Sequence, residues 1–561
     1  MFRSLPTRSW ALVALVTIAA YTPGIEWGAP TATAPDRVGS WGVDDETPLG
    51  PLSEIGNIIQ PKPDRNLGYP LLYSFLCAGA YAPYLGLLKL TGGFGVPSSE
   101  FPYGLKDPVR ALQVLTYLAH ALTVLFMVLM AIGLFEVGRR TTGMTLGGWL
   151  AAGLLLTVYP LGYYGRTGNV DGSMLGWLAM ALTALVAMVH DRVTRRRVVW
   201  LAAATGAALA TKEAGIGMLI GMGITTVLLI RRDGQRILSG ESLGLLSLGL
   251  LVSLLVLSVG SGFAIEPQRW MAHVREIAGK AEAAPSSLAT ALPYDLSGHL
   301  RLLSAIGQNL VFSLNWGGVA LVLAGVAMAL AQRASIAWLL IPVALESVTL
   351  FLLFRSPQLR YVLPMVIMLI PFGAYAVHLL WDHGKGIRAL VGVIVAGTLS
   401  LNTIRFVDLT YAMRHDSRYA AADWLATHLS PGDRVGHFGP THTLPALPGN
   451  ALLERVVSYH GFWGTHDLSD QLAARLEDDW RTNPPRVLLV IPDHTSPQNA
   501  PHNISLPPQL YRRLKRGETP LELVARFETQ SLFPWARRPA LDYPTVNPPV
   551  EIYAPRQASE P

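Results

Sequence analysis

The sequence predicts a polytopic α-helical membrane protein with a soluble α/β domain near its C-terminal end. Hydrophobic residues make up 51% of the 561 residues and charged residues only 15%. Apolar runs long enough to cross a bilayer recur along residues 1–404, separated by short basic links. From residue 405 onward these runs stop, and charged residues, Pro and His become more frequent. This change in composition predicts a second, soluble domain over residues 405–561.

The first apolar run, Trp10–Tyr21, follows Arg3 and Arg8 and has the length of a signal-peptide core. A cleaved signal peptide would end at small residues, whereas Pro23–Trp27 follow this run. We therefore predict an uncleaved first span with the N-terminus in the cytoplasm. A long outer loop over residues 23–109 then follows.

The segment 69–91 within this loop is apolar enough to span, but the positive-inside rule argues against a full crossing. If the segment lies at the membrane interface, the Arg clusters of the later links all face the cytoplasm. These clusters are at 139–140, 191–197 and 231–236. Four tyrosines, Pro83 and the terminal Lys89 favour the interfacial helix, and a full crossing is the alternative.

Together with the first span, about eleven spans are expected, so that the N- and C-termini lie on opposite sides of the membrane. This topology describes a multi-pass plasma (inner) membrane protein with an extracytoplasmic C-terminal domain. The remaining expected spans are 110–136, 144–163, 171–190, 198–211, 214–230, 243–263, 305–330, 336–354, 361–381 and 389–404.

A second outer loop is predicted over residues 264–304, where Trp270, His273 and Arg275 are typical of an amphipathic helix. In the C-terminal domain, a helix is predicted up to His428, with Asp416 or Ser417 as its cap. Short apolar runs bounded by Pro, Gly or Asp predict strands. These runs are 434–438, 486–491, 523–527 and 550–553.

Composition also excludes several classes of protein. The single cysteine, Cys77, excludes an intrachain disulfide. The net charge of +6 lies in the links between spans, whereas a protein that binds nucleic acid would carry it on a basic soluble face. His442, His460 and His466 lack the spacing of metal ligands, which favours surface or packing roles. Trp and Tyr side chains along the spans are typical of interface anchors, although Trp41 could also be a sugar platform.

The outer loops gather ionisable side chains of both signs. The acids are Asp44, Asp45, Glu46 and Asp171, and the bases are Arg166, Lys212, Arg355 and Arg360. Arg and Lys at the ends of spans often extend toward lipid headgroups, but outward-facing cations in very short links run against the positive-inside bias. A phosphate explains them, since Arg and Lys bind it through charge-assisted bonds. The carboxylates would then serve an acceptor nucleophile or a divalent metal.

Cations that bind a phosphate leaving group, together with a carboxylate that acts as a base, indicate the transfer of a group from the phosphate to a hydroxyl or amine. In the run Trp41–Pro48, Thr47 and Pro48 predict the N-cap and first residue of a helix. The three carboxylates would precede that helix, whose dipole favours their ionised forms. An acidic cap on an exposed helix is the structural alternative.

These motifs resemble the GT-C superfamily of polyprenyl-phosphate-dependent glycosyltransferases, in the branch of protein O-mannosyltransferases and aminoarabinose transferases. The family carries an Asp-Glu pair in its first outer loop, a Tyr-Pro-rich interfacial helix, an Asp after the third span, a Thr-Lys at a helical hairpin and an Arg-Tyr-hydrophobic-Leu-Pro run. The matches, in chain order, are Asp45-Glu46, Tyr69–Tyr73, Asp171, Thr211-Lys212 and Arg360–Pro364. The similarity covers about residues 8–405, with two departures, Asp44 before the pair and Glu213 in place of an aromatic residue.

The resemblance implies an inverting sugar transfer from a polyprenyl-phosphate donor to an extracytoplasmic lipid, glycan or protein. Asp45 would be the base, supported by Glu46, Asp44 or Asp171. The residues on the lipid phosphate would be Arg360, Arg355, Lys212, Arg166 and Tyr361. No further cofactor is implied, and a divalent metal remains an alternative. The rival function is a non-catalytic lipid-linked glycan transporter or polymerisation partner, and a third is an inactive scaffold for the outer domain.

Overall fold

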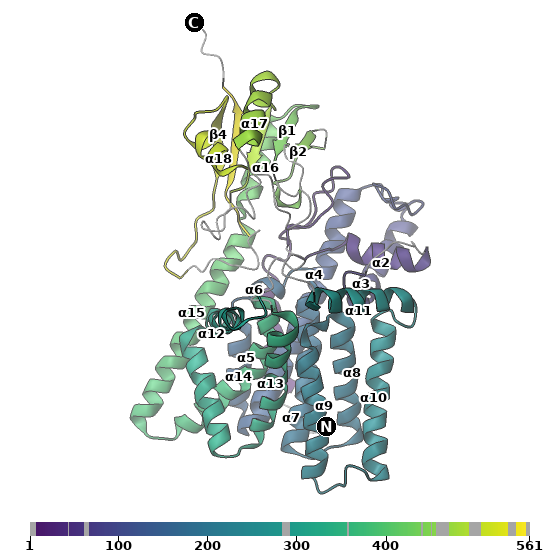
Figure 1. The fold of residues 1–561 in the computed structure, drawn as a ribbon, viewed down its shortest axis with the longest axis vertical. Helices are drawn as coiled ribbons and strands as arrows, with labels where there is room; N and C mark the ends of the chain where they lie inside the picture. The colour runs from purple at the N-terminus through teal and green to yellow at the C-terminus, as the bar shows by residue number, and fades with distance from the viewer. Residues whose placement is uncertain are drawn as a thin grey trace. The chain divides into compact units, whose positions relative to one another are not determined.

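The structure is a computed structural model that describes most of the chain. The described residues are 7–42, 44–60, 67–282, 292–355, 358–438, 441–449, 451–455, 470–492, 506–536 and 546–556. Within them, eight helices are long and apolar enough to cross a membrane (Figure 1). The predicted fold class, a polytopic helical membrane protein with a small C-terminal α/β sheet, is confirmed.

Each of the eleven expected spans falls on a helix, but three of these helices are short. They are α1 (Thr7–Tyr21), α5 (Thr145–Leu156) and α8 (Arg195–Thr211), with 15, 12 and 17 residues. At about 1.5 Å per residue, such helices are shorter than the roughly 30 Å of a bilayer's hydrocarbon core. The eight longer spans contain α4 (Pro108–Thr142), α7 (Val170–His190), α9 (Ile216–Arg232), α10 (Gly240–Gly260), α12 (Leu296–Ala331), α13 (Leu340–Thr349), α14 (Leu359–Trp381) and α15 (Lys385–Arg414).

Three further helices belong to the predicted loops. The segment 69–91 forms α3 (Leu72–Leu90), which is not among the eight candidate spans found in the described residues. Its position at the interface stays a prediction. The amphipathic helix is α11 (Pro267–Glu282), which lies across the ends of α8 and α10 (Figure 1). The helix that follows the three carboxylates is α2 (Leu49–Ile59).

The chain forms two compact units, each described here by itself. The helical unit consists of Met1–Ile25, Gly50–Tyr81 and Leu118–Val407, and the mixed unit consists of Glu26–Leu49, Ala82–Tyr117 and Asp408–Pro561. The mixed unit therefore combines the segment that carries the three carboxylates with the C-terminal region. A domain boundary at residue 405 stays our proposal for the C-terminal region.

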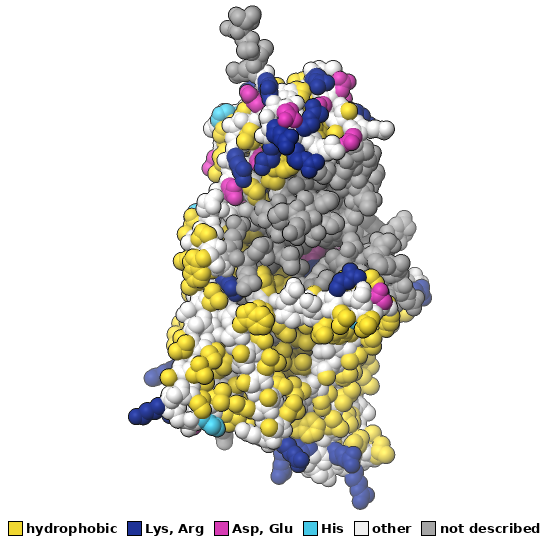
Figure 2. All heavy atoms as spheres, turned by 60° about the vertical axis from the view of Figure 1, so that its left-hand side comes forward, with side chains coloured by type: hydrophobic (Ala, Val, Ile, Leu, Met, Phe, Trp, Pro, Cys, Tyr) yellow, Lys and Arg dark blue, Asp and Glu magenta, His cyan; other side chains and the backbone are white. Residues whose placement is uncertain are grey.

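In the helical unit, α7 and α14 are largely buried, whereas α10 exposes much of its apolar surface. Leu250, Leu251 and Leu255 of α10 are each more than 60% exposed, as expected for side chains that face lipid. Figure 2 shows another face of the helical unit, which is covered largely by hydrophobic side chains, with Lys and Arg side chains gathered at one end of it. The unit thus presents the surface of a membrane-embedded helical bundle.

The expected span 305–330 is part of a longer helix with an internal break. Asn315 of α12 has non-helical torsion angles, φ 54° and ψ 176°. Its side-chain oxygen accepts hydrogen bonds from the backbone N–H groups of Gly317 and Gly318, and its amide donates to Asn402 at 3.0 Å. These bonds satisfy backbone groups that the break would leave without partners in an apolar surrounding.

The mixed unit contains a five-stranded sheet in the order β2-β1-β3-β5-β4. The strands are β1 (Arg434–His437), β2 (Leu452–Arg455), β3 (Val487–Val490), β4 (Leu521–Phe527) and β5 (Val550–Pro555). β2, β1 and β3 are parallel, with Val435 opposite Leu453 and Val487, while β5 is antiparallel to β3 and β4. The four predicted strands are confirmed, and β2 is an additional strand.

Three helices accompany the sheet: α16 (Ser417–His428), α17 (Asp470–Thr482) and α18 (Pro508–Lys515). The predicted cap of α16 is confirmed, because the Asp416 side chain accepts a hydrogen bond from the Arg418 backbone N–H. One hydrophobic cluster packs around Trp480 and Leu510, and a second around Leu425 and Val435. His460 and His466 lie outside the described residues, as does the side chain of His442.

Candidate functional site

The helical unit contains a buried ion pair between Lys212 and Asp171. The Lys212 Nζ atom lies 2.7 Å and 2.8 Å from the two carboxylate oxygens of Asp171, and the side chains are 5% and 1% exposed. Asp171 lies in the first turn of α7, where the capping Asn169 accepts a hydrogen bond from its backbone N–H. Lys212 follows the last residue of α8 in an extended conformation. Two predicted site residues from different helices therefore meet in one cluster.

Aromatic rings surround this ion pair. The Lys212 Nζ atom lies 5.6 Å from the ring centroids of both Tyr69 and Tyr361, within the range of a cation–π contact. The guanidinium carbon of Arg360 lies 5.6 Å from the same Tyr361 ring, and its Nε donates to Gln358 at 2.8 Å. Tyr361 thus links Lys212 with Arg360. The structure brings together Asp171, Lys212, Arg360 and Tyr361, all of them predicted site residues.

Arg355 occupies a strained turn five residues before Arg360. It has a left-handed backbone conformation with φ 47°, directly after the π-helical turn Leu350–Phe354. Its carbonyl accepts a hydrogen bond from the Leu292 backbone N–H at 3.0 Å, and its guanidinium lies 5.3 Å from the Tyr294 ring. Arg355 is therefore held against the segment that leads into α12.

Arg166 has the contacts of a structural residue. It is fully buried, and its guanidinium donates to the backbone carbonyls of Pro23 at 2.9 Å and Ala20 at 3.1 Å. The rings of Tyr21 and Phe406 flank it at 5.6 Å and 4.9 Å. A cation on the last carbonyls of a helix stabilises its C-terminus, here that of α1. Its contacts differ from those of the Lys212 cluster, and a role of Arg166 on the phosphate stays a prediction.

A carboxylate–imidazole pair lies beside Lys212. Glu213 Oε1 is 2.6 Å from Nε2 of His273, which belongs to α11. The His273 side chain is 5% exposed and that of Glu213 29% exposed. The sequence marked Glu213 only as a departure from the family pattern, and the long separation of the two residues hid their pairing. This contact joins α11 to the link between α8 and α9.

The three consecutive carboxylates lie in the mixed unit, in a segment that we call the carboxylate loop (residues 40–47, of which the structure describes all but 43). Asp45 is 7% exposed, and its Oδ1 accepts hydrogen bonds from the backbone N–H and the hydroxyl of Thr47 at 3.1 Å and 2.5 Å. Asp44 has a left-handed conformation with φ 56°. Partial loss of hydration and the negative charge of Asp45 both raise the pKa of Glu46.

The predicted helix after Thr47 begins one residue later than expected. α2 starts at Leu49 rather than at Pro48, and the Thr47 hydroxyl binds Asp45. A Thr hydroxyl can accept from a helix or donate to a carboxylate, and here the nearby buried carboxylate is its partner. Thr47 therefore orients Asp45, a role that the sequence did not indicate.

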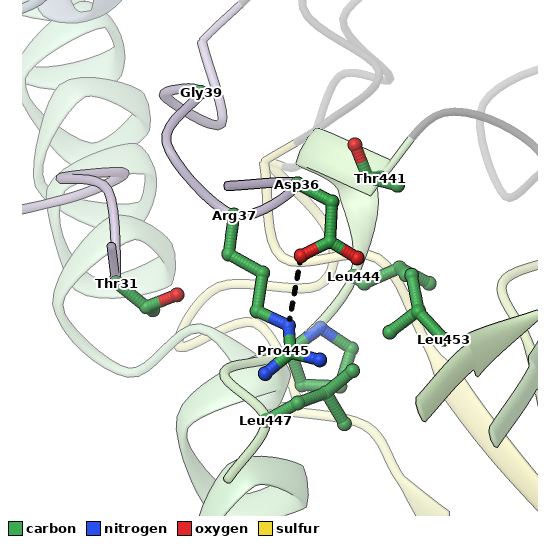
Figure 3. Close-up of a pocket in the computed structure, with 9 residues that line it drawn as sticks. All are labelled: Thr31, Asp36, Arg37, Gly39, Thr441, Leu444, Pro445, Leu447 and Leu453. Carbon is green, nitrogen blue, oxygen red and sulfur yellow. Dashed lines mark ion pairs between the residues drawn. The ribbon is translucent and has the colours of Figure 1, made fainter. Parts of the chain in front are cut away.

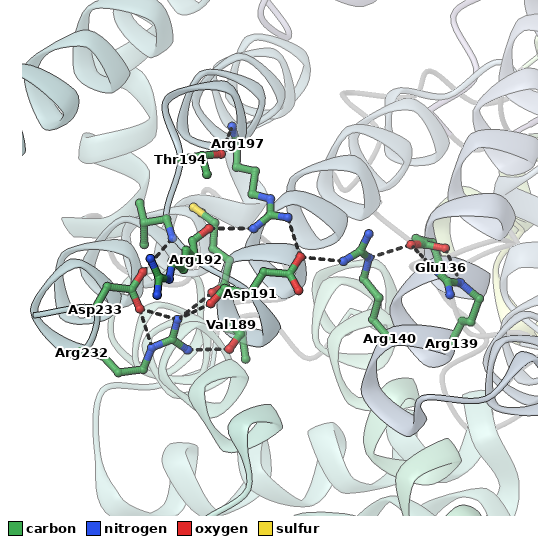
Figure 4. A network of polar contacts seen from close by, with 12 residues as sticks. Glu136, Arg139, Arg140, Val189, Asp191, Arg192, Thr194, Arg197, Arg232 and Asp233 are labelled. Atoms are coloured by element: carbon green, nitrogen blue, oxygen red, sulfur yellow. Dashed lines mark hydrogen bonds and ion pairs between the residues drawn. The ribbon is translucent and has the colours of Figure 1, made fainter. Parts of the chain in front are cut away.

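A network of arginines lies at the ends of α7 and α8 that are opposite to Asp171 and Lys212 (Figure 4). Glu136 at the end of α4 binds Arg139 and Arg140, and Arg140 also binds Asp191 at 3.1 Å. Asp191, which follows α7, binds Arg197 at 2.5 Å as well.

Arg232 at the end of α9 extends this network. It contacts the Asp233 carboxylate and the backbone carbonyls of Met188 and Val189. The Arg clusters expected on one side of the membrane therefore meet at one end of the helical unit.

The mixed unit has a hollow that is open to solvent. It is lined by Thr31, Asp36, Arg37, Gly39, Thr441, Leu444, Pro445, Leu447 and Leu453 (Figure 3). The predicted site residues do not line it. Across the described part of the chain, no three His, Cys, Asp or Glu side chains come together as a metal site would require.

Residues 117–261 match the model of a family described as dolichyl-phosphate-mannose-protein mannosyltransferase. The resemblance drawn from the sequence motifs is confirmed over this part of the chain, which includes Asp171 and Lys212. No curated protein sequence matches the chain.

Three solved structures illustrate the likeness found among known folds. ArnT from Cupriavidus metallidurans, bound to undecaprenyl phosphate, is 13% identical with a TM-score of 0.46, and the match covers 98% of each chain. The oligosaccharyltransferase AglB from Archaeoglobus fulgidus, in complex with an inhibitory peptide and a dolichol-phosphate, is 12% identical with a TM-score of 0.43, over 86% of this chain and 68% of that one. Arabinofuranosyltransferase AftD from Mycobacteria is 15% identical with a TM-score of 0.40, and this chain, covered over 99%, spans 42% of its length.

Proposed function

We propose that the chain is an integral-membrane glycosyltransferase that transfers a sugar from a polyprenyl-phosphate donor to an acceptor outside the cytoplasm. The observation that carries the proposal is the cluster of Lys212, Asp171 and Arg360 around the Tyr361 ring. Buried charges inside a membrane bundle are costly, so their retention points to a function. The family model over residues 117–261 supports sugar transfer as that function.

In this proposal, Arg360 and Lys212 bind the lipid phosphate. A guanidinium can contact two phosphate oxygens at once, and Arg360 is only partly buried. An ammonium group has three N–H donors. The contacts of Lys212 with the two oxygens of Asp171 use two of these donors at most. Asp171 would thus orient Lys212 and balance its charge until the donor binds. Arg355 and Tyr361 complete the donor site.

Asp45 is the proposed base. It takes the proton of the acceptor hydroxyl or amine, whose heteroatom then forms a bond to the anomeric carbon of the sugar. The bond between that carbon and the phosphate oxygen breaks, and the phosphate leaves with the bonding electrons. A direct displacement of this kind inverts the anomeric carbon. The bonds from Thr47 hold the Asp45 carboxylate in one orientation, while Glu46 and Asp44 support it.

The arrangement of charges also supports a topology. The Arg-rich end of the helical unit would face the cytoplasm under the positive-inside rule, together with the N-terminus. The end with Asp171 and Lys212 would then face outward, as would the C-terminal region from residue 405. On this proposed topology, the transfer takes place on the extracytoplasmic side of the plasma (inner) membrane.

The proposal is tested by turnover of the purified protein with a panel of polyprenyl-phosphate sugars and extracts of envelope acceptors. We expect release of free polyprenyl phosphate that depends on acceptor and is lost in the Asp44→Asn, Asp45→Asn double variant. Binding of polyprenyl phosphate should survive in that double variant and weaken in Arg360→Ala. Binding without sugar release from any donor would instead favour a lipid-linked glycan transporter or polymerisation partner.

A further inference from the structure

The carboxylate loop is attached to the C-terminal region by buried contacts within the mixed unit. The first attachment is made by Arg37, whose side chain is 7% exposed. Its two terminal nitrogens donate to the backbone carbonyls of Pro448 at 2.7 Å and Ala451 at 2.6 Å. Figure 3 shows the Arg37 side chain directed toward Pro445 and Leu447 of that segment. One side chain thus spans two carbonyls of the C-terminal region.

The second attachment is an ion pair flanked by two tryptophans. Arg418 contacts Asp416 through two nitrogens, at 2.8 Å and 2.7 Å, and both side chains are fully buried. The Trp27 indole N–H donates to the same carboxylate at 2.9 Å. The Trp41 ring lies 3.8 Å from the guanidinium carbon of Arg418, a close cation–π contact. Trp41 is therefore buried against the C-terminal region.

These attachments reach Asp45 through a short path. Trp41 lies four residues before Asp45, and its backbone N–H donates to the carbonyl of Gly28 at 3.0 Å. The Ser40 hydroxyl donates to the carbonyl of Thr47 at 2.5 Å, which closes the carboxylate loop at its base. Thr47 in turn binds the Asp45 carboxylate. The loop is thus fixed at both ends before its carboxylate is oriented.

We infer that the C-terminal region is a positioning element for the catalytic loop, with Arg37, Trp41 and Arg418 as positioning residues for Asp45. This inference rests on the proposed function and gives residues 405–561 a part in the reaction. The donor residues Lys212 and Arg360 belong to the helical unit, so loosening the loop should slow the chemical step without weakening donor binding. A general loss of fold would not separate these two effects.

The experiment compares Arg37→Ala with Arg37→Lys, Trp41→Ala with Trp41→Phe, and a matched control, Arg434→Ala, in the full-length protein. Arg434 also lies in the C-terminal region but pairs with Glu454 of β2. We expect kcat to fall roughly 10- to 100-fold in Arg37→Ala and Trp41→Ala, because small displacements of a reacting group have effects of this size. KM for the donor and the Kd for polyprenyl phosphate should stay unchanged. Trp41→Phe, which keeps a ring over Arg418, and Arg37→Lys, which keeps one donor nitrogen, should recover part of kcat.

Amide hydrogen exchange provides a readout that does not depend on activity. Peptides covering residues 40–47 should exchange faster in Arg37→Ala and Trp41→Ala than in the wild type, while Arg434→Ala should match the wild type. Unchanged kcat and unchanged exchange in both alanine variants would overturn the inference, and so would a parallel rise in donor KM. If the wild type transfers no sugar from any donor, the proposed function fails, whereas the exchange data still decide whether the C-terminal region fixes the loop.

Discussion

Two buried ion pairs, one in each unit, each join a basic side chain to an aspartate but have different surroundings. Lys212–Asp171 and Arg418–Asp416 each combine a cation and a carboxylate that are at most 5% exposed, with two aromatic rings within 6 Å of the cation. The Asp416 carboxylate also accepts from the Trp27 indole and the Asn547 backbone N–H, so many protein groups depend on it. The Lys212 pair instead adjoins a further cation, Arg360, across a shared ring.

This difference separates a structural ion pair from a candidate binding site. A pair whose carboxylate also accepts hydrogen bonds from an indole and from a loop backbone N–H stabilises the fold around it. A pair next to an additional, partly exposed cation offers a second positive side chain that can bind an anion. Burial alone does not distinguish the two, because both pairs are almost fully removed from solvent.

The largest expected effect comes from removing one partner of either pair. Arg418→Met or Asp171→Ala should each lower the free energy of unfolding by about 3–5 kcal/mol, because the remaining charge stays buried without its counter-ion. Urea or thermal unfolding of the purified protein in detergent measures the change. A loss below about 1 kcal/mol in both variants would show that each buried pair contributes little to the stability of the unit that contains it.

The double apolar replacements should then distinguish the two pairs. Lys212→Met with Asp171→Leu should recover most of the lost stability, since well-packed apolar residues often replace a buried ion pair at little cost. This double variant should not bind polyprenyl phosphate, because Lys212 is absent. Arg418→Met with Asp416→Leu should recover less stability, because Trp27 and Asn547 lose their acceptor as well. Equal recovery of stability in both doubles would contradict the comparison.

Arg360→Ala tests the contribution of the additional cation next to the Lys212 pair. Loss of one donor to a developing phosphate charge should lower kcat/KM roughly 100- to 1000-fold, with little change in the free energy of unfolding because the side chain is partly exposed. Arg360→Lys should recover only part of this, since an ammonium cannot bind two phosphate oxygens in the geometry of a guanidinium. Steady-state kinetics with varied donor, alongside an unfolding curve for each variant, separates the two outcomes.

A smaller effect is expected at the Arg-rich end of the helical unit. Asp191→Asn removes two ion pairs whose aspartate is 49% exposed, so the cost should be about 0.2–1 kcal/mol per pair and should shrink with added salt. Donor KM should stay at the wild-type value. A change in donor KM would show that this network also affects the proposed donor site.

The smallest effect concerns Glu46. Because its pKa is raised above the ordinary value of 4.5, the folded protein binds this proton more tightly than the unfolded chain and loses stability as pH rises through the folded pKa. Glu46→Gln removes this loss, so the variant should be slightly more stable than the wild type at pH 7 and equal to it below pH 4. Unfolding curves at the two pH values check the sign, and a variant less stable at pH 7 would reverse the assignment.

Much of the fold followed from local patterns in the sequence. Helical segments in the membrane were predictable because apolar runs dictate them, and so was the Asp416 cap, which depends on neighbouring residues. The break at Asn315 was not predictable, since its amide is satisfied by Asn402 and Thr398, more than 80 residues away. Strand β2 was missed because its four residues, Leu452–Arg455, are two apolar residues followed by two charged ones and show no alternation.

The candidate site was predictable as a set of residues and not as a set of partners. Asp171, Lys212 and Arg360 were selected by charge and position, yet the sequence could not show that Asp171 neutralises Lys212 or that Arg166 stabilises the end of α1. Pairings such as Glu213 with His273 arise only when distant segments pack together. An ionisable residue can therefore be recognised in a sequence before its task can be assigned.

The mixed unit is assembled from segments that the ribosome makes far apart in time. Residues 26–49 emerge early, and roughly 360 residues, including most of the membrane helices, follow before the partners of Trp27 and Trp41 at Asp416 and Arg418 are made. At about 5–20 residues per second, this interval lasts some 20–70 s. During that time the apolar surfaces of both tryptophans have no native partner from the C-terminal region. The early segment therefore has to stay free of aggregation until the C-terminal region has been synthesised.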